Sequence, residues 1–127
     1  MTPEEILLKH WSDSTVLNAI IPAKNVFAGP VAINTKPFVC VICGEIKPFC
    51  STSNAASPVS FAMHLELNCD SFDTGSVQMD QIISAIDTVR ISSSDQRTMI
   101  PRFVALNRKR IGETHWVLTA AFDCFLG

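Results

Sequence analysis

The sequence has almost no excess charge of either sign. Its 10 basic and 12 acidic residues give a formal net charge of −2. Binding to DNA or RNA through the phosphate backbone needs a basic surplus, so we expect no specific nucleic-acid partner. Charged residues make up 17% of the chain, below the roughly 25% of typical soluble domains. A surface with so few charges favours a protein that buries part of it against a partner.

Long apolar runs and a basic N-terminus are also missing. Every uninterrupted apolar stretch is far shorter than the about 20 residues of a membrane-spanning helix. Residues 1–11 have neither the basic start nor the long apolar segment of a secretory signal peptide. We therefore expect a cytoplasmic protein without membrane contact. At 127 residues the chain has the length of a single domain, which we place at residues 1–127.

Groups with the spacing of a catalytic site are absent as well. The five glycines form no phosphate-binding loop. His10, His64 and His115 have no spacing that joins them to a cysteine or serine nucleophile. Glu66 and Asp70 would share one strand face about 13 Å apart, which is farther than the carboxylate pair of a glycosidase. The sequence thus predicts no catalytic residue, no cofactor and no small-molecule substrate.

Cysteine occurs in an odd number, which argues against a disulfide framework. Cys40 and Cys43 form a C-x-x-C motif, the spacing of a zinc half-site or a redox pair. Zinc would need two further ligands, for which Cys50, Cys69 and His64 are candidates. A redox pair would open a helix, whereas these two residues lie in a predicted strand and point to opposite faces. We interpret both as buried core thiols and expect no bound metal.

Two helical regions are predicted. Thr2, Pro3 and Glu5 fit a capping box with a proline at the first helical position, so a helix begins at Thr2. Residues 12–14 should divide this region into two short helices. A second main helix follows residues 73–75. Its expected apolar stripe consists of Val77, Ile82, Ile83, Ile86 and Val89.

Strand periodicity predicts one sheet. Residues 38–46 are predicted as a strand, and its residues 38–43 are apolar on both faces, as in a central strand. We expect helices to cover it on one side and a partner subunit on the other. Residues 59–70 alternate apolar and polar side chains and should pair antiparallel with that strand. Residues 98–106 and 114–125 form a second hairpin through a charged turn at 107–113. The order indicates an α+β fold, an antiparallel or mixed β-sheet of about four to five strands with two main helices packed on one face.

The core should form where these periodicities match. One face of the alternating strand, the stripe of the second main helix and one face of the last strand each need apolar cover. The residues expected to pack together are Phe61, Met63, Leu65, Leu67, Ile82, Ile83, Ile86, Trp116, Leu118, Ala120 and Phe122.

Basic residues concentrate at one place in the sequence, the charged turn. Arg108, Lys109 and Arg110 follow one another there. They fit a solvated hairpin tip, or a patch that contacts nucleic-acid phosphates, although no base-stacking aromatic residues lie among them. In an assembly we expect them to contact acidic residues of a neighbouring molecule, since charges at the rim of an interface steer association. The acidic candidates on that neighbour are Glu66, Asp70 and Asp73.

This order of elements resembles the tail-completion, or tail-terminator, proteins of long-tailed bacteriophages and prophages, which take part in head–tail joining. In that family an N-terminal helix, an extended strand, a polar loop, an alternating strand, a helix and a final hairpin recur. The matching segments are residues 3–11, 26–30, 36–43, the loop 47–58, 60–69, 70–75, 77–89 and 115–124.

The resemblance implies a virion structural protein rather than an enzyme. It implies a subunit of a ring, a hexamer, that binds tail-tube and head-connector proteins. Such a subunit assembles in the cytoplasm of the bacterial host and ends in the virion. The five cysteines are not part of the family pattern. A second hypothesis is a small α+β enzyme or ligand-binding domain with a pocket between sheet and helices, and a third is a thiol or metal protein that uses Cys40 and Cys43.

Overall fold

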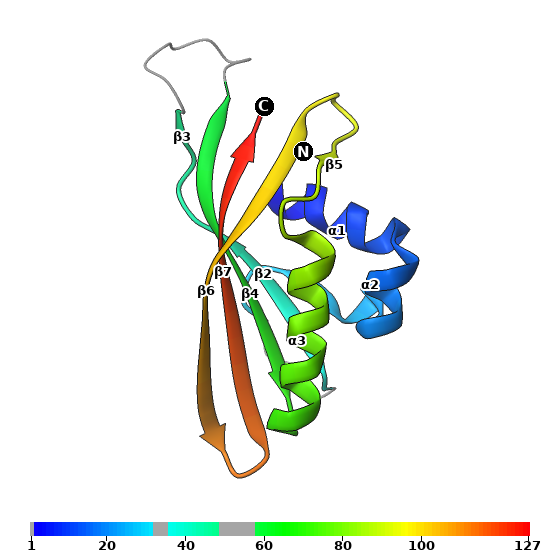
Figure 1. Cartoon of the computed structure of the whole chain (residues 1–127), viewed down its shortest axis with the longest axis vertical. Coiled ribbons are helices and arrows are strands. Elements are labelled where there is room, and N and C mark those ends of the chain that lie inside the picture. Colours follow the sequence, from blue (N-terminus) through cyan, green and yellow to red (C-terminus); the bar gives the residue numbers. More distant parts are fainter. Residues whose placement is uncertain (1, 32–35, 49–57) are drawn as a thin grey trace.

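The computed structural model describes residues 2–31, 36–48 and 58–127. These residues fold into one sheet with helices on one of its faces (Figure 1). The α-helices are α1 (Pro3–Asp13), α2 (Thr15–Ile20) and α3 (Phe72–Ile86), and a short 3-10 helix spans Ala23–Asn25. The strands are β1 (Val26–Ala28), β2 (Phe38–Cys43), β3 (Lys47–Pro48), β4 (Val59–Cys69), β5 (Ile91–Ser92), β6 (Thr98–Gly112) and β7 (His115–Leu126).

The sheet is mixed, as predicted. Its strand order is β1-β2-β4-β7-β6-β5, with β3 paired to β4 beside that path. β1 and β2 run parallel, and the other pairs are antiparallel. The described residues form seven strands, more than the about four to five predicted. The added strands β3 and β5 have two residues each, which is too short to produce a periodic signal.

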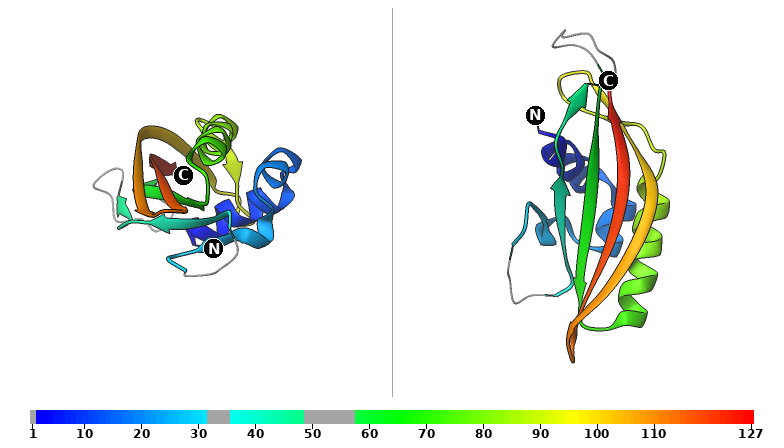
Figure 2. Two further views of the ribbon diagram at one scale, coloured as in Figure 1. Left: turned by 90° about the horizontal axis from the view of Figure 1, so that it is seen from below. Right: turned by 90° about the vertical axis from the view of Figure 1, so that its left-hand side faces the viewer.

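The sheet curls, and the helices pack along the inner side of the curl (Figure 2). In the right-hand view of Figure 2 the strands face the viewer and the helices lie behind them. α3 contacts β4 and β7, while α1 contacts β1, β2 and β5. The face of the sheet away from the helices keeps side chains such as Ala62 and His64 exposed. The predicted packing of helices on one face is therefore what the structure shows.

The N-terminal helices begin and end where local signals place them. The Thr2 hydroxyl accepts a hydrogen bond from the Glu5 backbone N–H at 3.2 Å, and Pro3 occupies the first helical position. Ser14 ends α1 and caps α2, where its hydroxyl accepts from the Leu17 N–H at 3.2 Å. A side chain that bonds its own following backbone competes with helix continuation. The predicted division into two helices is confirmed.

β2 is central, but its outer face is covered differently from our expectation. It pairs antiparallel with β4, as predicted, in a register that places Cys40 opposite Glu66. The outer face is covered by this chain itself rather than by a partner subunit. The Phe27 ring packs edge-on against Phe38 with centroids 6.3 Å apart, and the Cys40 sulfur lies 4.0 Å from the Val31 carbonyl.

The extended segment around β2 is shorter than predicted. β2 ends at Cys43 rather than at residue 46. The Gly44 N–H still donates to the Ala62 carbonyl at 2.7 Å, and the chain pairs with β4 again as β3. The predicted polar loop 47–58 therefore begins with a strand, and its residues 49–57 lie outside the described part of the chain.

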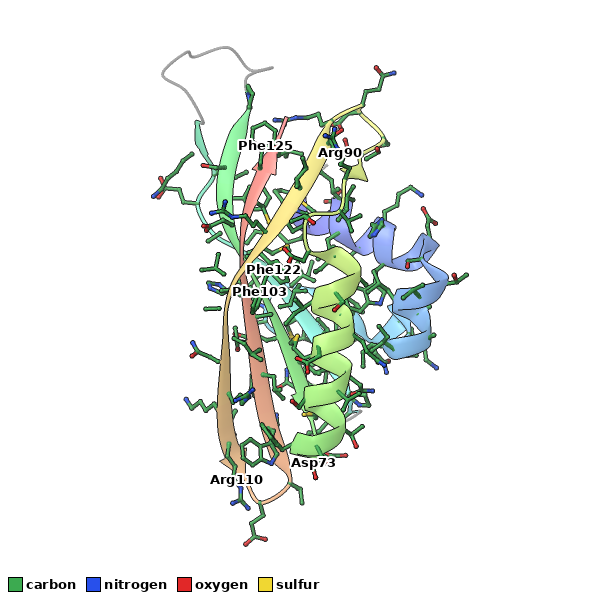
Figure 3. The ribbon with its side chains drawn as sticks, viewed as in Figure 1. Asp73, Arg90, Phe103, Arg110, Phe122 and Phe125 are labelled. Atoms are coloured by element: carbon green, nitrogen blue, oxygen red, sulfur yellow. The ribbon has the colours of Figure 1, made fainter. Side chains whose placement is uncertain are left out.

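The predicted core is largely confirmed. Ile83 and Trp116 are partly buried, and Phe103 and Phe122 pack with ring centroids 5.8 Å apart (Figure 3). Val77, expected in the stripe of α3, is instead 58% exposed, because the inner stripe of that helix runs through Gly75, Met79, Ile82 and Ile86. The buried members of the predicted core are Phe61, Met63, Leu65, Leu67, Ile82, Ile86, Leu118, Ala120 and Phe122.

The second hairpin is longer than predicted. β6 continues through Arg108, Lys109 and Arg110 to Gly112, so these cations lie on a strand and not in a turn. The register shifts between Phe103 and Ala105, which marks a β-bulge. The hairpin therefore extends well beyond the bulge, and its tip lies at the lower end of the molecule in Figure 1.

Candidate assembly surface

Two arginines of β6 stack on aromatic rings at the tip of the hairpin. The Arg108 guanidinium carbon lies 5.5 Å from the centre of the Phe72 ring, and that of Arg110 lies 5.8 Å from the Trp116 ring. Phe72 and Trp116 contact each other, with centroids 4.9 Å apart. Each cation gains an electrostatic attraction to the face of its ring. Both guanidinium groups are thereby positioned on the helix side of the sheet, beside the start of α3.

Arg110 is also bonded to the turn. Its Nε donates to the Gly112 carbonyl at 3.0 Å, and one terminal nitrogen donates to the Glu113 carbonyl at 3.4 Å. Lys109 lies between the two arginines in sequence and therefore points to the opposite face. There it lines a shallow cavity of about 560 Å³ together with Glu66. The hairpin thus presents positive charge on both of its faces.

The acidic residues predicted to contact a neighbour lie at this same end of the molecule. Asp73 is exposed on the first turn of α3 (Figure 3), and Asp70 follows the end of β4. Asp70 forms an ion pair with Lys36, with 3.4 Å between the Lys36 Nζ and the Asp70 Oδ1. Glu66 is half-buried on the outer face of the sheet. Across the described ranges, no ion pair joins these carboxylates to the hairpin cations within one subunit.

The outer edge of β6 is open over much of its length. β5 pairs with it at Thr98 and Met99, and the Asp87 carboxylate accepts from the Phe103 N–H at 2.8 Å. Beyond that point no described strand pairs with β6 on this side. Unpaired peptide groups on an edge strand are available to another molecule. The open part of this edge belongs to the same strand as the stacked arginines. Its unpaired peptide groups and the guanidinium groups are therefore available on neighbouring parts of one surface.

The C-x-x-C motif does not form a shared site. Cys40 pairs with Glu66 and Cys43 with Met63, so the two thiols lie on opposite faces of β2. Burial raises the pKa of both thiols, and the nearby Glu4 carboxylate adds to the rise at Cys43. Among residues 2–31, 36–48 and 58–127, no cluster of three histidine, cysteine or acidic residues is arranged to hold a metal ion. The candidate ligand Cys50 lies outside these ranges.

The histidines occupy three separate places. His115 lies 2.9 Å from the Asn68 side-chain oxygen, which supplies a partner for a buried amide. His64 is exposed on the outer face of β4. Burial lowers the pKa of His10 on α1, against an opposing effect of Asp13. His115 lies at the hairpin tip beside Trp116, where it pairs with Gly112, while His10 and His64 lie elsewhere.

Stability should fall in alkaline solution because of the buried thiols. Burial, with a smaller contribution from the Asp123 carboxylate, raises the pKa of Cys124 to about 12, whereas a free thiol ionises near pH 8.5. Between these values the unfolded chain loses a proton that the folded chain keeps. The stabilisation is complete below about pH 8.5 and falls by up to about 1.4 kcal/mol per pH unit as the pH approaches 12. Denaturation curves from pH 8 to 11 should show a shallower fall for Cys124→Ala; an unchanged slope would contradict the assignment.

A groove between α2 and α3 was not predicted from the sequence. It has a volume of about 550 Å³, and its apolar lining includes Val16, Ile20 and Val77. Asp80 lies at its polar side. The helical spacing of Val77 predicts that it lies in the core, whereas the structure exposes it on the groove. The packing of Phe72 and Trp116 under the two arginines was also not predicted, because it joins residues that are distant in the sequence.

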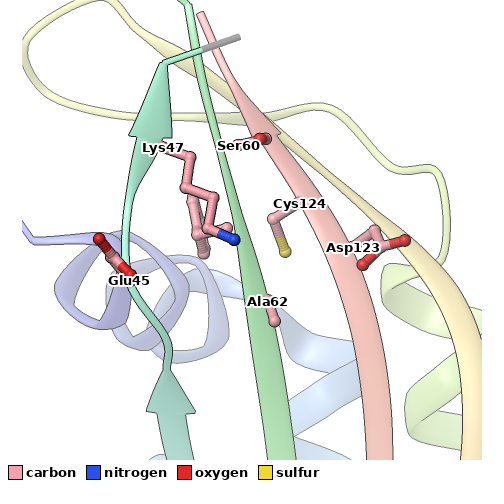
Figure 4. A pocket seen from close by; sticks show the side chains of 7 residues that line it. Glu45, Lys47, Ser60, Ala62, Asp123 and Cys124 are labelled. Atoms are coloured by element: carbon pink, nitrogen blue, oxygen red, sulfur yellow. The ribbon is translucent and has the colours of Figure 1, made fainter.

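A further cavity of about 480 Å³ opens at the opposite end of the sheet, beside β3 (Figure 4). Glu45, Lys47 and Asp123 bring charges of both signs to its lining. Cys124 also contributes, but its raised pKa keeps the thiol protonated at neutral pH. A protonated thiol is a weak nucleophile.

None of the helices in the described ranges is long and apolar enough to cross a membrane.

The architecture is that of an α+β domain whose curled mixed sheet carries a long projecting hairpin. No family model and no curated protein matches the sequence. Among solved structures, the chain is similar to one described as "Virion of native gene transfer agent (GTA) particle". The TM-score is 0.73 at 12% identity, over 98% of this chain and 93% of the other. At this identity the likeness shows a shared fold, and the fold is shared along nearly the whole of both chains.

Proposed function

We propose that this protein is a structural subunit of a phage-like particle. The observation that carries the proposal is the fold shared with a chain of a gene transfer agent virion over 98% of this chain. The exposed cationic hairpin and the open β6 edge support it, because both are suited to contacts between proteins. The low share of charged residues supports it as well.

Within such a particle, the function that fits best is a tail-terminator ring that joins the tail tube to the head connector. Copies of the chain associate head to tail into a closed ring, a hexamer. The ring binds tail-tube protein on one face and connector protein on the other. It forms in the host cytoplasm and is then carried in the virion. The end of the subunit that carries Arg108, Lys109 and Arg110, with Glu66, Asp70 and Asp73 beside them, is the proposed contact surface.

A ligand-binding domain with a pocket between sheet and helices is the weaker alternative. That space is occupied by a continuous cluster of buried side chains drawn from the helices and the sheet. The cavities that the described residues form lie at the surface instead. A surface groove with apolar walls and one acidic side chain is better suited to a protein than to a small polar substrate.

The proposed function is tested by assembly. Co-expression with the products of adjacent genes, followed by electron microscopy and mass measurement, should yield rings of this chain bound to tail tubes or connectors. A chain that stays monomeric at every concentration and binds none of these proteins would refute the proposal. Capsid, portal and tail-tube genes beside its own gene are the expected context.

Reversal of the hairpin charges should slow assembly without unfolding the subunit. The change is the triple substitution of Arg108, Lys109 and Arg110 by glutamate. Each lost arginine–ring contact costs about 0.5–1 kcal/mol, so the fold is retained. Rim charges act mainly on the association rate, and we expect about tenfold slower assembly with an altered salt dependence.

Light scattering at several ionic strengths measures the rate of this assembly. The matched control substitutes glutamate for three exposed basic residues elsewhere, which changes the net charge equally. Equal slowing in the control would show that total charge, not the hairpin, decides the rate. The control residues are Lys24, Lys47 and Arg90.

A further inference from the structure

Four of the exposed aliphatic side chains among the described residues lie on two surfaces of the subunit. Val16 and Val77, at 61% and 58% exposure, line the groove between α2 and α3. Val104 and Ile111, at 55% and 58%, lie on β6. Val16 and Val77 lie together, and exposed apolar groups that cluster indicate an interaction surface. Val104 and Ile111 are seven residues apart on β6, so Ile111 is the single apolar side chain at the hairpin end of the strand. The subunit therefore has an apolar recess on its helices and an exposed apolar side chain, Ile111, near the tip of its hairpin.

The same two elements carry opposite charge. β6 contains four basic residues and no acidic one, whereas α3 contains two acidic residues and no basic one. Ile111 follows Lys109 and Arg110 directly, and Asp80 lines the groove with Val77. The recess and the hairpin tip thus match in apolar character and complement each other in charge.

The two surfaces also lie on opposite sides of the molecule. In Figure 1 the β6–β7 hairpin is at the lower left and α2 is at the right, and the left-hand view of Figure 2 separates them in the same way. A contact between two different surfaces of one protein is heterologous and generates a ring when its rotation closes. Glu66, Asp70 and Asp73 lie at the same end as the cations, so that end supplies only one side of a head-to-tail contact between subunits. The cations then need an acidic partner on the other surface, and Asp80 on the groove is in that place.

We propose that the α2–α3 groove of one subunit receives the β6 hairpin of a second copy of this chain. Ile111 enters the groove against Val16 and Val77, and Asp80 pairs with Lys109 or Arg110 of the incoming hairpin. The inference rests on the proposed ring and names the two surfaces that form it. It also accounts for the exposure of Val77, which contributes nothing to the core of its own subunit.

Site-directed cross-linking tests the contact. Ile111→Cys protein is mixed with Val77→Cys protein under oxidising conditions, at the highest concentration at which the chain stays soluble. We expect a disulfide-linked dimer at least tenfold above the background of either variant alone. The control uses Ile46→Cys in place of Ile111→Cys. Ile46 is 48% exposed and lies on neither of the two surfaces. Equal cross-linking with Ile46→Cys, or with Ile111→Cys alone, would overturn the proposal.

A charge exchange provides a second, independent test. Asp80→Lys should weaken self-association about tenfold, and Lys109→Glu in the same chain should restore most of it. Loss without restoration, together with absent cross-links, refutes the contact. Rings that form normally in both single variants refute this contact while the proposed function stands. A chain that forms no rings and binds no tail or connector protein refutes the proposed function itself.

Discussion

Replacement of Trp11 by alanine is expected to lower the free energy of unfolding by about 4 kcal/mol. The indole is fully buried and lies in the core between the N-terminal helices and the sheet. Its Nε1–H donates to the Ile21 carbonyl at 2.8 Å, and the Asn18 amide donates to the Trp11 carbonyl at 2.7 Å. Truncation therefore leaves a cavity and an unpaired buried carbonyl at once. Trp11 is therefore the main apolar anchor of the corner between α1 and α2, beside the hydrogen bonds of the Asn18 amide.

Chemical denaturation followed by circular dichroism measures the loss, since the fluorescence of Trp11 is removed by the change. Trp11→Phe is the control, because it keeps most of the apolar volume and removes the hydrogen bond to Ile21. It should cost about 1–3 kcal/mol, the penalty of an unsatisfied buried acceptor. A loss below about 1 kcal/mol for Trp11→Ala would contradict the role of Trp11 as the anchor of the corner.

The parts of the fold that the sequence predicts well are governed by local signals. The cap at Thr2 and the break at Ser14 depend on hydroxyl groups that bond peptide groups a few residues away. β4 was predictable because one of its faces is buried and the other is wet, which imposes a period of two on the sequence. Its pairing with β2 followed from the apolar character of both strands.

The length of β6 could not be predicted, because the physical condition behind the pattern is absent there. From Asn107 to Gly112 every residue of the strand is exposed. With neither face buried, selection imposes no apolar alternation, and the charged run from Arg108 to Arg110 has the composition of a turn. Pairing with β7 holds this segment extended. The cations were identified correctly, but their strand conformation required the partner strand.

Contacts between distant residues set the other limits. Arg108 of β6 stacks on Phe72 at the start of α3, so that the rest of α3, β5 and the first part of β6 separate them in the sequence. The outer face of β2 was assigned to a partner subunit, yet Phe27 and Val31 of the same chain cover it. The rotation of α3 about its axis is set by the close approach of Gly75 to Cys69. Apolar spacing alone placed Val77 in the buried stripe, whereas the structure buries Met79 instead.

Gly75→Ala is expected to destabilise the protein by about 2–3 kcal/mol. Alanine favours an isolated helix over glycine by about 1 kcal/mol, so the sign depends on packing. A Cβ at Gly75 would overlap the Cys69 sulfur, and it would lie 3.2 Å from the Cys69 Cβ and 3.3 Å from a methyl carbon of Leu118. These atoms belong to β4 and β7 in the buried core, which has no room to yield. The helix must therefore move away from the sheet.

A double-mutant cycle with Cys69→Ala isolates this contact. Alone, Cys69→Ala creates a small cavity and should cost about 1 kcal/mol or slightly more. Combined with Gly75→Ala, the new methyl group occupies that cavity, so the double variant should be more stable than the sum of the single losses by about 1–2 kcal/mol. Gly112→Ala is the matched control, since a Cβ there meets no atom within 4 Å, and it should be nearly neutral. A neutral or stabilising Gly75→Ala would mean that α3 stands off the sheet, and the position of the α2–α3 groove would then have to be revised.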